Sequence, residues 1–102
     1  MNFTRFKTSL TAIKPPPGLA PALEALWWDA KGDWTKAHEL AQENESDKAS
    51  AWVHAYLHRV EGDLSNAAWW YRAAGRKAQT GSLKAEWAAM VTELLAAAPR
   101  AD

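Results

Sequence analysis

The sequence predicts an all-α protein of two helix-turn-helix repeat units followed by a C-terminal capping helix. Its first indication is an internal repeat, because ALWWDAKGDWTKA at residues 25–37 recurs in looser form as AYLHRVEGDLSNA at residues 55–67. Repeats of roughly this period are the signature of stacked helical units. After residue 18, apolar residues follow the i, i+3, i+4, i+7 spacing of amphipathic helices. No alternating run of β-branched residues predicts a strand.

Composition narrows the classes of protein that the chain can represent. Its 102 residues lie in the range of a single domain, with one modest core. Twelve basic residues balance twelve acidic ones, so we expect neither a nucleic acid nor an anionic membrane as a partner. The chain has no cysteine, which excludes disulfides and thiolate metal sites. With no apolar run of about 20 residues and no apolar leader, a cytoplasmic location is expected.

Residues 1–18 are expected to form an extended or flexible N-terminal tail ahead of a single helical domain at residues 19–98. The segment ends in three prolines and Gly18, which favour polyproline geometry and prevent a helix from entering. Helical structure is therefore expected only after Gly18. The alternative is that the tail packs along the body through Phe3, Phe6 and Ile13.

Four helices are expected in the two repeat units. The first occupies residues 19–31, ends at Gly32, and carries apolar residues on one face. Asp33 then caps a second helix, which ends in the polar stretch 42–47. The next two helices repeat this arrangement, and they run from Ser46 or Asp47 to Gly62 and from Asp63 or Ser65 to Gly75.

A fifth helix is expected to begin at Ser82 and to continue until Pro99. It carries one clean apolar stripe and is polar elsewhere, as the terminal cap of a helical repeat requires.

The second unit resembles the tetratricopeptide superfamily, and most closely its Sel-one-like branch. The residues that match its second-helix motif are Asp63, Ala67, Trp70, Tyr71 and Ala74, with Asn66 in place of the usual Lys. In the first unit Gly32, Asp33, Lys36 and Ala37 agree with the motif. The resemblance implies a right-handed stack in which the first helix of each unit lines a concave side. The offset of thirty residues is shorter than the typical 34, and two units make only a shallow groove.

The repeat register identifies the residues expected on the concave side. It aligns Glu24 with His54 and Trp28 with His58, and Asp29 follows Trp28. We therefore expect a non-enzymatic interaction module whose groove, lined by aromatic and histidine side chains, binds a peptide segment or a small ligand. No cofactor is predicted.

Trp69 is a further candidate contact residue, because it points away from the packing face of its helix. It is expected either to pack on the last helix or to stay exposed as a contact surface, including one for homo-oligomers.

Metal binding or catalysis is the alternative function. His54 and His58 lie one turn apart on one helical face, with Glu61 three residues later, and such a set can bind a transition metal or act as an acid-base pair. A metal needs further ligands, for which His38 and Asp29 are the candidates. Residues 54–58 read HAYLH, which is not a known catalytic helix motif, so ordinary polar histidines are a third interpretation.

Overall fold

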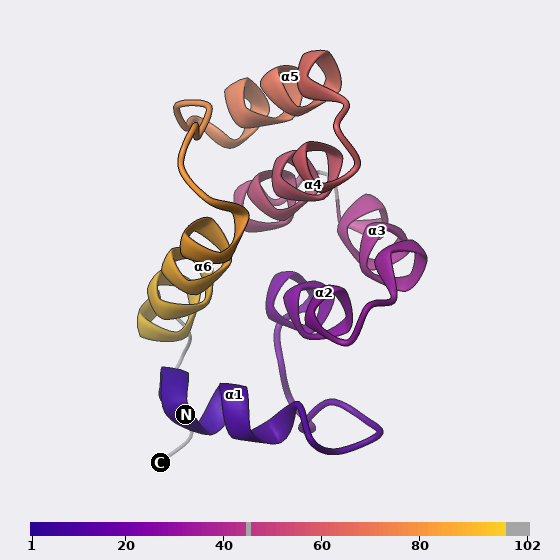
Figure 1. Ribbon diagram of the computed structural model, residues 1–102, viewed down its shortest axis with the longest axis vertical. Helices are drawn as coiled ribbons and strands as arrows, with labels where there is room; N and C mark the ends of the chain where they lie inside the picture. Colours follow the sequence, from indigo (N-terminus) through magenta and orange to yellow (C-terminus); the bar gives the residue numbers. More distant parts are fainter. Residues whose placement is uncertain (45, 98–102) are drawn as a thin grey trace.

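The protein is built entirely from α-helices in the part of the chain that its computed structural model describes, residues 1–44 and 46–97. The helices are α1 (Phe3–Ser9), α2 (Pro21–Ala30), α3 (Trp34–Glu43), α4 (Lys48–Val60), α5 (Leu64–Ala74) and α6 (Leu83–Ala97). Helices α2 and α3 form one hairpin, α4 and α5 form a second, and α6 packs against both α2 and α4 (Figure 1). The all-α prediction is therefore confirmed for these residues.

Matching turn chemistry joins the two helices of each hairpin. Gly32 and Gly62 adopt φ values of +87° and +86°, which lie in the left-handed region that terminates a helix without strain only for glycine. The next residue caps the following helix in both cases. The Asp33 carboxylate accepts a hydrogen bond from the Lys36 amide at 3.0 Å, and the Asp63 carboxylate accepts one from the Asn66 amide at 3.2 Å.

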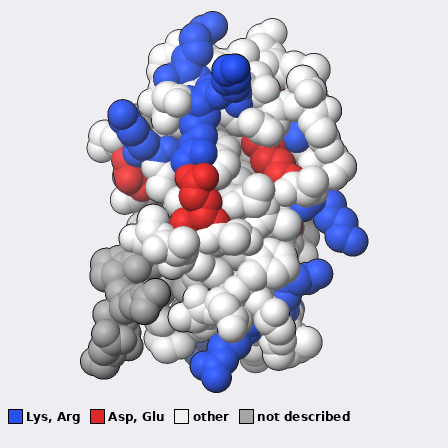
Figure 2. Space-filling model, turned by 90° about the vertical axis from the view of Figure 1, so that its left-hand side faces the viewer, with Lys and Arg blue, Asp and Glu red and all other residues white. Residues whose placement is uncertain are grey.

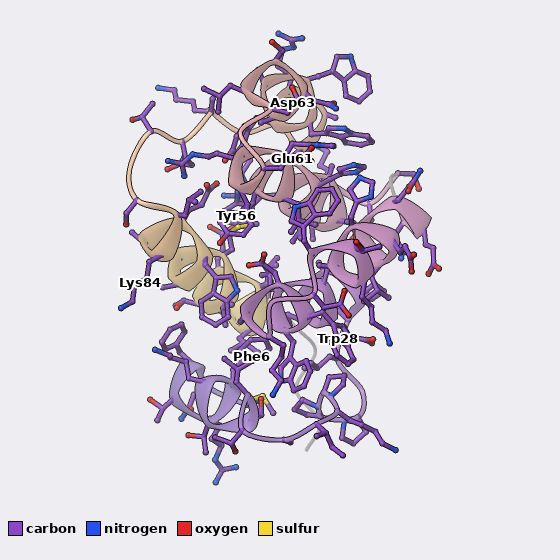
Figure 3. All side chains as sticks on the ribbon, turned by 45° about the vertical axis from the view of Figure 1, so that its right-hand side comes forward. Phe6, Trp28, Tyr56, Glu61, Asp63 and Lys84 are labelled. Carbon is purple, nitrogen blue, oxygen red and sulfur yellow. The ribbon has the colours of Figure 1, made fainter. Side chains whose placement is uncertain are left out.

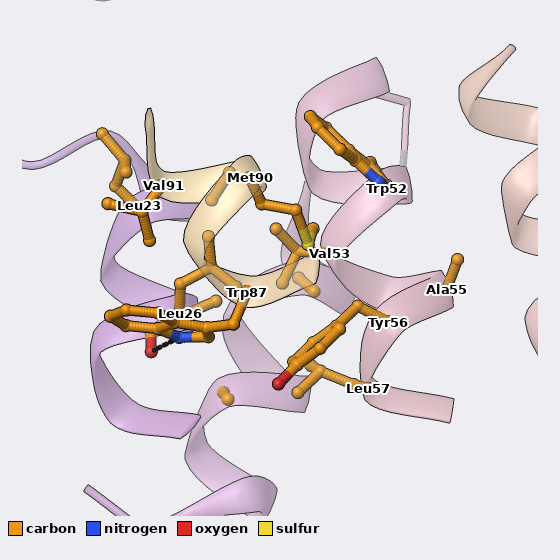
Figure 4. Close-up of a cluster of buried hydrophobic side chains, with 14 of the residues drawn as sticks. Leu23, Leu26, Trp52, Val53, Ala55, Tyr56, Leu57, Trp87, Met90 and Val91 are labelled. Carbon is orange, nitrogen blue, oxygen red and sulfur yellow. Dashed lines mark hydrogen bonds between the residues drawn. The ribbon is translucent and has the colours of Figure 1, made fainter. Parts of the chain in front are cut away.

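Helix α4 is the centre of the molecule, since it contacts α2, α3, α5 and α6. All its residues from 50 to 58 are buried, which explains why its sequence shows no fully polar face. On one side, Trp87 and Met90 of α6 insert between α2 and α4 (Figure 4). The Trp87 indole donates a hydrogen bond to the Leu26 carbonyl at 3.0 Å, so α6 is fixed to α2 by both apolar and polar contacts.

A buried ion pair attaches α6 to the second hairpin. Arg59 of α4 donates to the Glu86 carboxylate at 2.8 Å, and the Tyr71 hydroxyl of α5 donates to the other carboxylate oxygen at 2.5 Å. Arg59 also donates to the carbonyl of Gly81, just before α6. Only 2% of the Glu86 side chain and 12% of the Arg59 side chain are exposed. This network therefore holds three helices together through charges removed from water.

The N-terminal segment differs from the expected extended or flexible tail, because residues 3–9 form helix α1. Asn2 caps this helix by accepting a hydrogen bond from the Arg5 amide at 2.9 Å. Phe6 is completely buried, with its ring centroid 5.9 Å from that of Trp87. The expectation that helices begin only after Gly18 was wrong, because the proline run restricts its neighbours and not a helix several residues earlier.

The rest of the segment lies against the body only in part. The Lys31 ammonium donates to the carbonyls of Leu10 and Ala12, and the Trp27 indole donates to the Ser9 hydroxyl at 3.1 Å. Ile13, expected to pack on the body, is instead 85% exposed.

Helix α6 begins one residue after its predicted cap, since Ser82 accepts a hydrogen bond from the Ala85 amide at 3.0 Å. Its predicted end at Pro99, and so the domain limit at 98, lies outside the described residues.

Among residues 1–44 and 46–97, no helix combines the length and apolar character that crossing a membrane would require.

Candidate functional site

All three histidines of the chain meet in one cluster between α3 and α4. His38 comes from α3, and His54 and His58 come from successive turns of α4. The Nε2 atoms of His38 and His54 are 3.0 Å apart, and one ring nitrogen from each of the three residues lies within 4.8 Å of the others. The one-turn spacing on α4 places both of its imidazoles on one face of the helix, and this face lies against α3.

Two tryptophans hold the imidazole rings in place. Trp34, one turn before His38, stacks on the His38 ring with 4.8 Å between centroids. The Trp34 indole also donates to the Leu57 carbonyl at 2.8 Å, which fixes α3 against α4. On the other side Trp70 of α5 stacks on His54 at 3.8 Å. Rings packed in this way lose little further conformational freedom when they bind a ligand.

The cluster is largely shielded from solvent, since His54 is 3% exposed and His58 is 7% exposed. His54 packs between His38 of α3 and Trp70 of α5, and His58 packs against α3. Both side chains are therefore buried, whereas they were expected to line an open groove. The Nδ1 atom of His54 is buried without a hydrogen-bond partner among the described residues. A buried nitrogen left unpaired costs about 1–3 kcal/mol, so the cluster carries an energetic cost that its own contacts do not offset.

Burial and mutual proximity favour the neutral form of the His38 and His54 imidazoles. Burial is the largest cause that lowers the pKa of His54 to about 4, and the nearby His38 and His58 rings contribute to the same shift. The pKa of His38 is also lowered, mainly by burial and then by His58. Neutral imidazole is the form that coordinates a metal ion, so His54 stays in the form able to coordinate well below neutral pH.

Carboxylates border the cluster at the end of α4 (Figure 3). The Nδ1 atom of His58 lies 2.6 Å from a carboxylate oxygen of Glu61, and Asp63 has a carboxylate oxygen within 4.8 Å of both. A carboxylate hydrogen-bonded to one imidazole nitrogen orients the ring and makes its other nitrogen more basic. Because Glu61 occupies the Nδ1 atom of His58, Nε2 is the ring nitrogen that remains available for another partner.

The other residues predicted for the site lie elsewhere. Trp28 is half-buried beside Trp27, with the Lys36 ammonium 4.4 Å from its ring centroid. Glu24 is half-buried on α2, and Trp69 is 54% exposed on α5. Of the two candidates for a third metal ligand, His38 joins the cluster. Asp29 lies instead beside Tyr56, at a separate cavity.

Sequence reasoning missed the tryptophans that support the cluster. Trp34 and His38 are four residues apart on α3, the same spacing as His54 and His58 on α4. These two pairs with the same spacing on consecutive helices were the sequence signal that could have indicated a cluster of aromatic and histidine rings. The contribution of Trp70 depends on how α5 folds back over α4, which no local pattern reveals.

Comparison with protein-family models, with curated proteins and with solved structures found no match to this chain.

Proposed function

We propose that the protein binds a divalent transition metal ion, such as Zn²⁺, through His38, His54 and His58. The observation that carries the proposal is the convergence of every histidine in the chain on one point between two helices. Three imidazoles with a fourth position left for water or another ligand are a known zinc-binding set.

The separations of the ring nitrogens support this proposal. With Zn–N bonds of about 2.0–2.1 Å, tetrahedral coordination places ligand nitrogens roughly 3.4 Å apart. The Nε2 atoms of His38 and His54 are 3.0 Å apart, and the third nitrogen lies within 4.8 Å of both. Small changes of side-chain torsion would therefore bring all three into coordination without moving a helix.

The surroundings of the cluster favour a cation over a structural role for the imidazoles alone. The two neutral rings of His38 and His54 share a single contact between their Nε2 atoms, and an ion shared by the rings would supply coordination energy there. The carboxylates of Glu61 and Asp63 add negative charge on one side. Glu61 would act as a positioning residue, because its carboxylate contacts the His58 ring and orients it.

Metal titration of the untagged, chelator-treated full-length protein tests the proposal. We expect one equivalent of Zn²⁺ or Co²⁺ to bind, with visible absorption bands of tetrahedral Co²⁺ and shifts of all three histidine ring signals by NMR. At a free Zn²⁺ concentration of about 100 times Kd, the free energy of unfolding should rise by about 2.7 kcal/mol. This corresponds to an increase in Tm of roughly 10–20 °C.

His38→Gln is the variant of choice, because His38 is the least buried of the three ligands. It should abolish the zinc-dependent rise in Tm, whereas Glu39→Gln, at the exposed next position, should retain it. Failure of the wild-type protein to bind either metal, or zinc stabilisation that persists in His38→Gln, would sink the proposal. The NMR readout on the wild-type protein decides the matter even where the variant does not fold.

We infer that α2–α5 are two short tetratricopeptide-like units. Equivalent backbone hydrogen bonds support this: the Asp33 amide donates to the Trp28 carbonyl, and the Asp63 amide donates to the His58 carbonyl, both at 2.9 Å. The closing contacts of each hairpin thus recur thirty residues apart, in the register of the sequence repeat.

A role as an interaction module is a second candidate, for which the exposed Trp69 is the supporting observation. Leu64 is 66% exposed on the same helix, and α5 packs mainly on α4, with the Tyr71 hydroxyl reaching Glu86 of α6. A second copy of the chain is the expected partner, because such an edge helix can pair with itself. Sedimentation should then show concentration-dependent association that Trp69→Ala removes, whereas a monomer at all concentrations would refute this role.

A further inference from the structure

A second site lies where α1, α2, α4 and α6 meet, in a cavity of about 210 Å³ that opens to solvent. Its wall is apolar and is formed by Leu10, Ala30 and the indole of Trp87. Because the Trp87 nitrogen already donates to the Leu26 carbonyl, the ring is fixed and presents an apolar surface to the cavity. None of the histidines lines this cavity, so it is independent of the proposed metal site.

The carboxyl group of Asp29 lies on the α2 side of the cavity. Asp29 is half-buried and is hydrogen-bonded by the Tyr56 hydroxyl, and burial raises its pKa. In the described part of the chain no basic side chain lies within ion-pair distance of Asp29. Asp29 also belongs to the last turn of α2, where the helix dipole adds negative potential. The Asp29 carboxylate is thus an acceptor that would gain from a cationic donor.

Two lysines stand at the border of the same cavity. Lys7 of α1 and Lys84 of α6 are exposed, and neither forms an ion pair with another described residue. Their flexible stems let the ammonium groups reach over the opening while remaining hydrated. Figure 3 shows Lys84 and Tyr56 on the same side of the molecule. On the face that presents α6, basic groups outnumber acidic ones, and the acidic groups lie among the basic ones in its upper half (Figure 2). The lysines therefore favour a single carboxylate over a polyanion.

We propose that this cavity binds a small zwitterion with an apolar body, the chemistry of an amino acid with an apolar side chain. Its ammonium pairs with Asp29, its carboxylate with Lys7 and Lys84, and its apolar part lies against Trp87. The volume of the cavity suits a small ligand, because 210 Å³ corresponds to the volume that about seven water molecules occupy in the liquid. Sites for drug-sized ligands and cofactors occupy about 300–1,000 Å³, so larger ligands do not fit.

Three probes that share one ring and differ in charge test the proposal. These are L-phenylalanine, 3-phenylpropionate, which lacks the ammonium, and 2-phenylethylamine, which lacks the carboxylate. Titration of the ¹⁵N-labelled full chain should shift the Trp87 indole and the Asp29 amide signals. L-phenylalanine should bind about tenfold more tightly than either analogue, as one lost charged hydrogen bond predicts.

Variants separate the two ends of the ligand. Asp29→Asn keeps an acceptor for Tyr56 and should remove the advantage of L-phenylalanine over 3-phenylpropionate. The double change Lys7→Met with Lys84→Met should remove its advantage over 2-phenylethylamine. Lys48→Met, an exposed lysine at the start of α4 that does not line the cavity, should change none of the affinities.

The comparison of probes on the wild-type protein is decisive even where a variant does not fold. Equal affinity for all three probes, shifts that do not involve Trp87, or no saturable binding of L-phenylalanine would overturn the proposal. Binding of 3-phenylpropionate that is at least as tight as that of L-phenylalanine would overturn it as well, since that result describes a site for simple carboxylates.

Discussion

Replacing Glu86 with Gln is expected to destabilise the protein far more than an exposed change of the same chemistry. The Glu86 side chain is 2% exposed, and it accepts one hydrogen bond from Arg59 and one from Tyr71. Glutamine keeps the shape and one oxygen acceptor, but it leaves the largely buried guanidinium without a counter-charge. One weakened charged hydrogen bond and an unpaired buried cation together predict a loss of about 2–4 kcal/mol in the free energy of unfolding.

Glu93→Gln on the same helix is the matched control. Glu93 pairs with Arg76, but the side chains are 51% and 37% exposed, so this ion pair contributes at most about 1 kcal/mol. Urea unfolding followed by circular dichroism measures both variants. If Glu86→Gln lost no more free energy of unfolding than Glu93→Gln, the stabilising role given to the buried Arg59–Glu86–Tyr71 network would be refuted. An Arg59→Met change added to Glu86→Gln should cost less than the two single changes summed, because it removes the unpaired cation.

Three further predictions concern the histidine cluster, a turn and the N-terminal helix. Lowering the pH from 7 to 5 in the presence of EDTA should reduce the free energy of unfolding by about 1 kcal/mol after solvent screening. The reason is that His54 has its ordinary pKa of 6.5 in the unfolded chain and a pKa of about 4 in the folded protein, so only the unfolded chain takes up a proton over this range. If urea unfolding of a His54→Gln variant showed the same change of stability with pH, this explanation would be contradicted. Gly62→Ala should lower stability by about 1–2 kcal/mol because of its φ of +86°, while Gly81→Ala, with open space and no positive φ, should be neutral in the same measurement. Phe6→Ala should release α1 and speed its hydrogen exchange, and Ile13→Ala, at an 85% exposed position, should not; equal exchange in the two variants would show that Phe6 does not anchor α1.

Local chemistry explains which parts of the fold were predictable. The turns within the two hairpins follow from single residues, because Gly32 and Gly62 stop α2 and α4, and Asp33 and Asp63 cap α3 and α5. Helix α1 was missed although Asn2 and the Phe3–Phe6 spacing were visible signals. A seven-residue helix is marginal alone, and α1 depends on the contact of Phe6 with Trp87, a residue about eighty positions away.

The sequence predicted which candidate site residues share one helix face, but not which residues of different helices come together. The spacing of His54 and His58 placed both on one face of α4, but the partner of that face is decided by the packing of α3 and α5. His38 and Asp29 were therefore equivalent candidates in the sequence, and they lie at different sites in the structure. The cavity beside Asp29 is built from four helices, so no pattern within a single helix predicts it.

The position of the histidines on different hairpins gives a bound metal a mechanical consequence. His38 belongs to the first hairpin and His54 to the second, sixteen residues later. An ion bound by both would act as a reversible cross-link that closes this loop. A covalent link around a loop of about 15 residues contributes about 3 kcal/mol by restricting the unfolded chain. Loss of the ion would therefore loosen the junction between the hairpins while leaving each hairpin's own turn and caps intact.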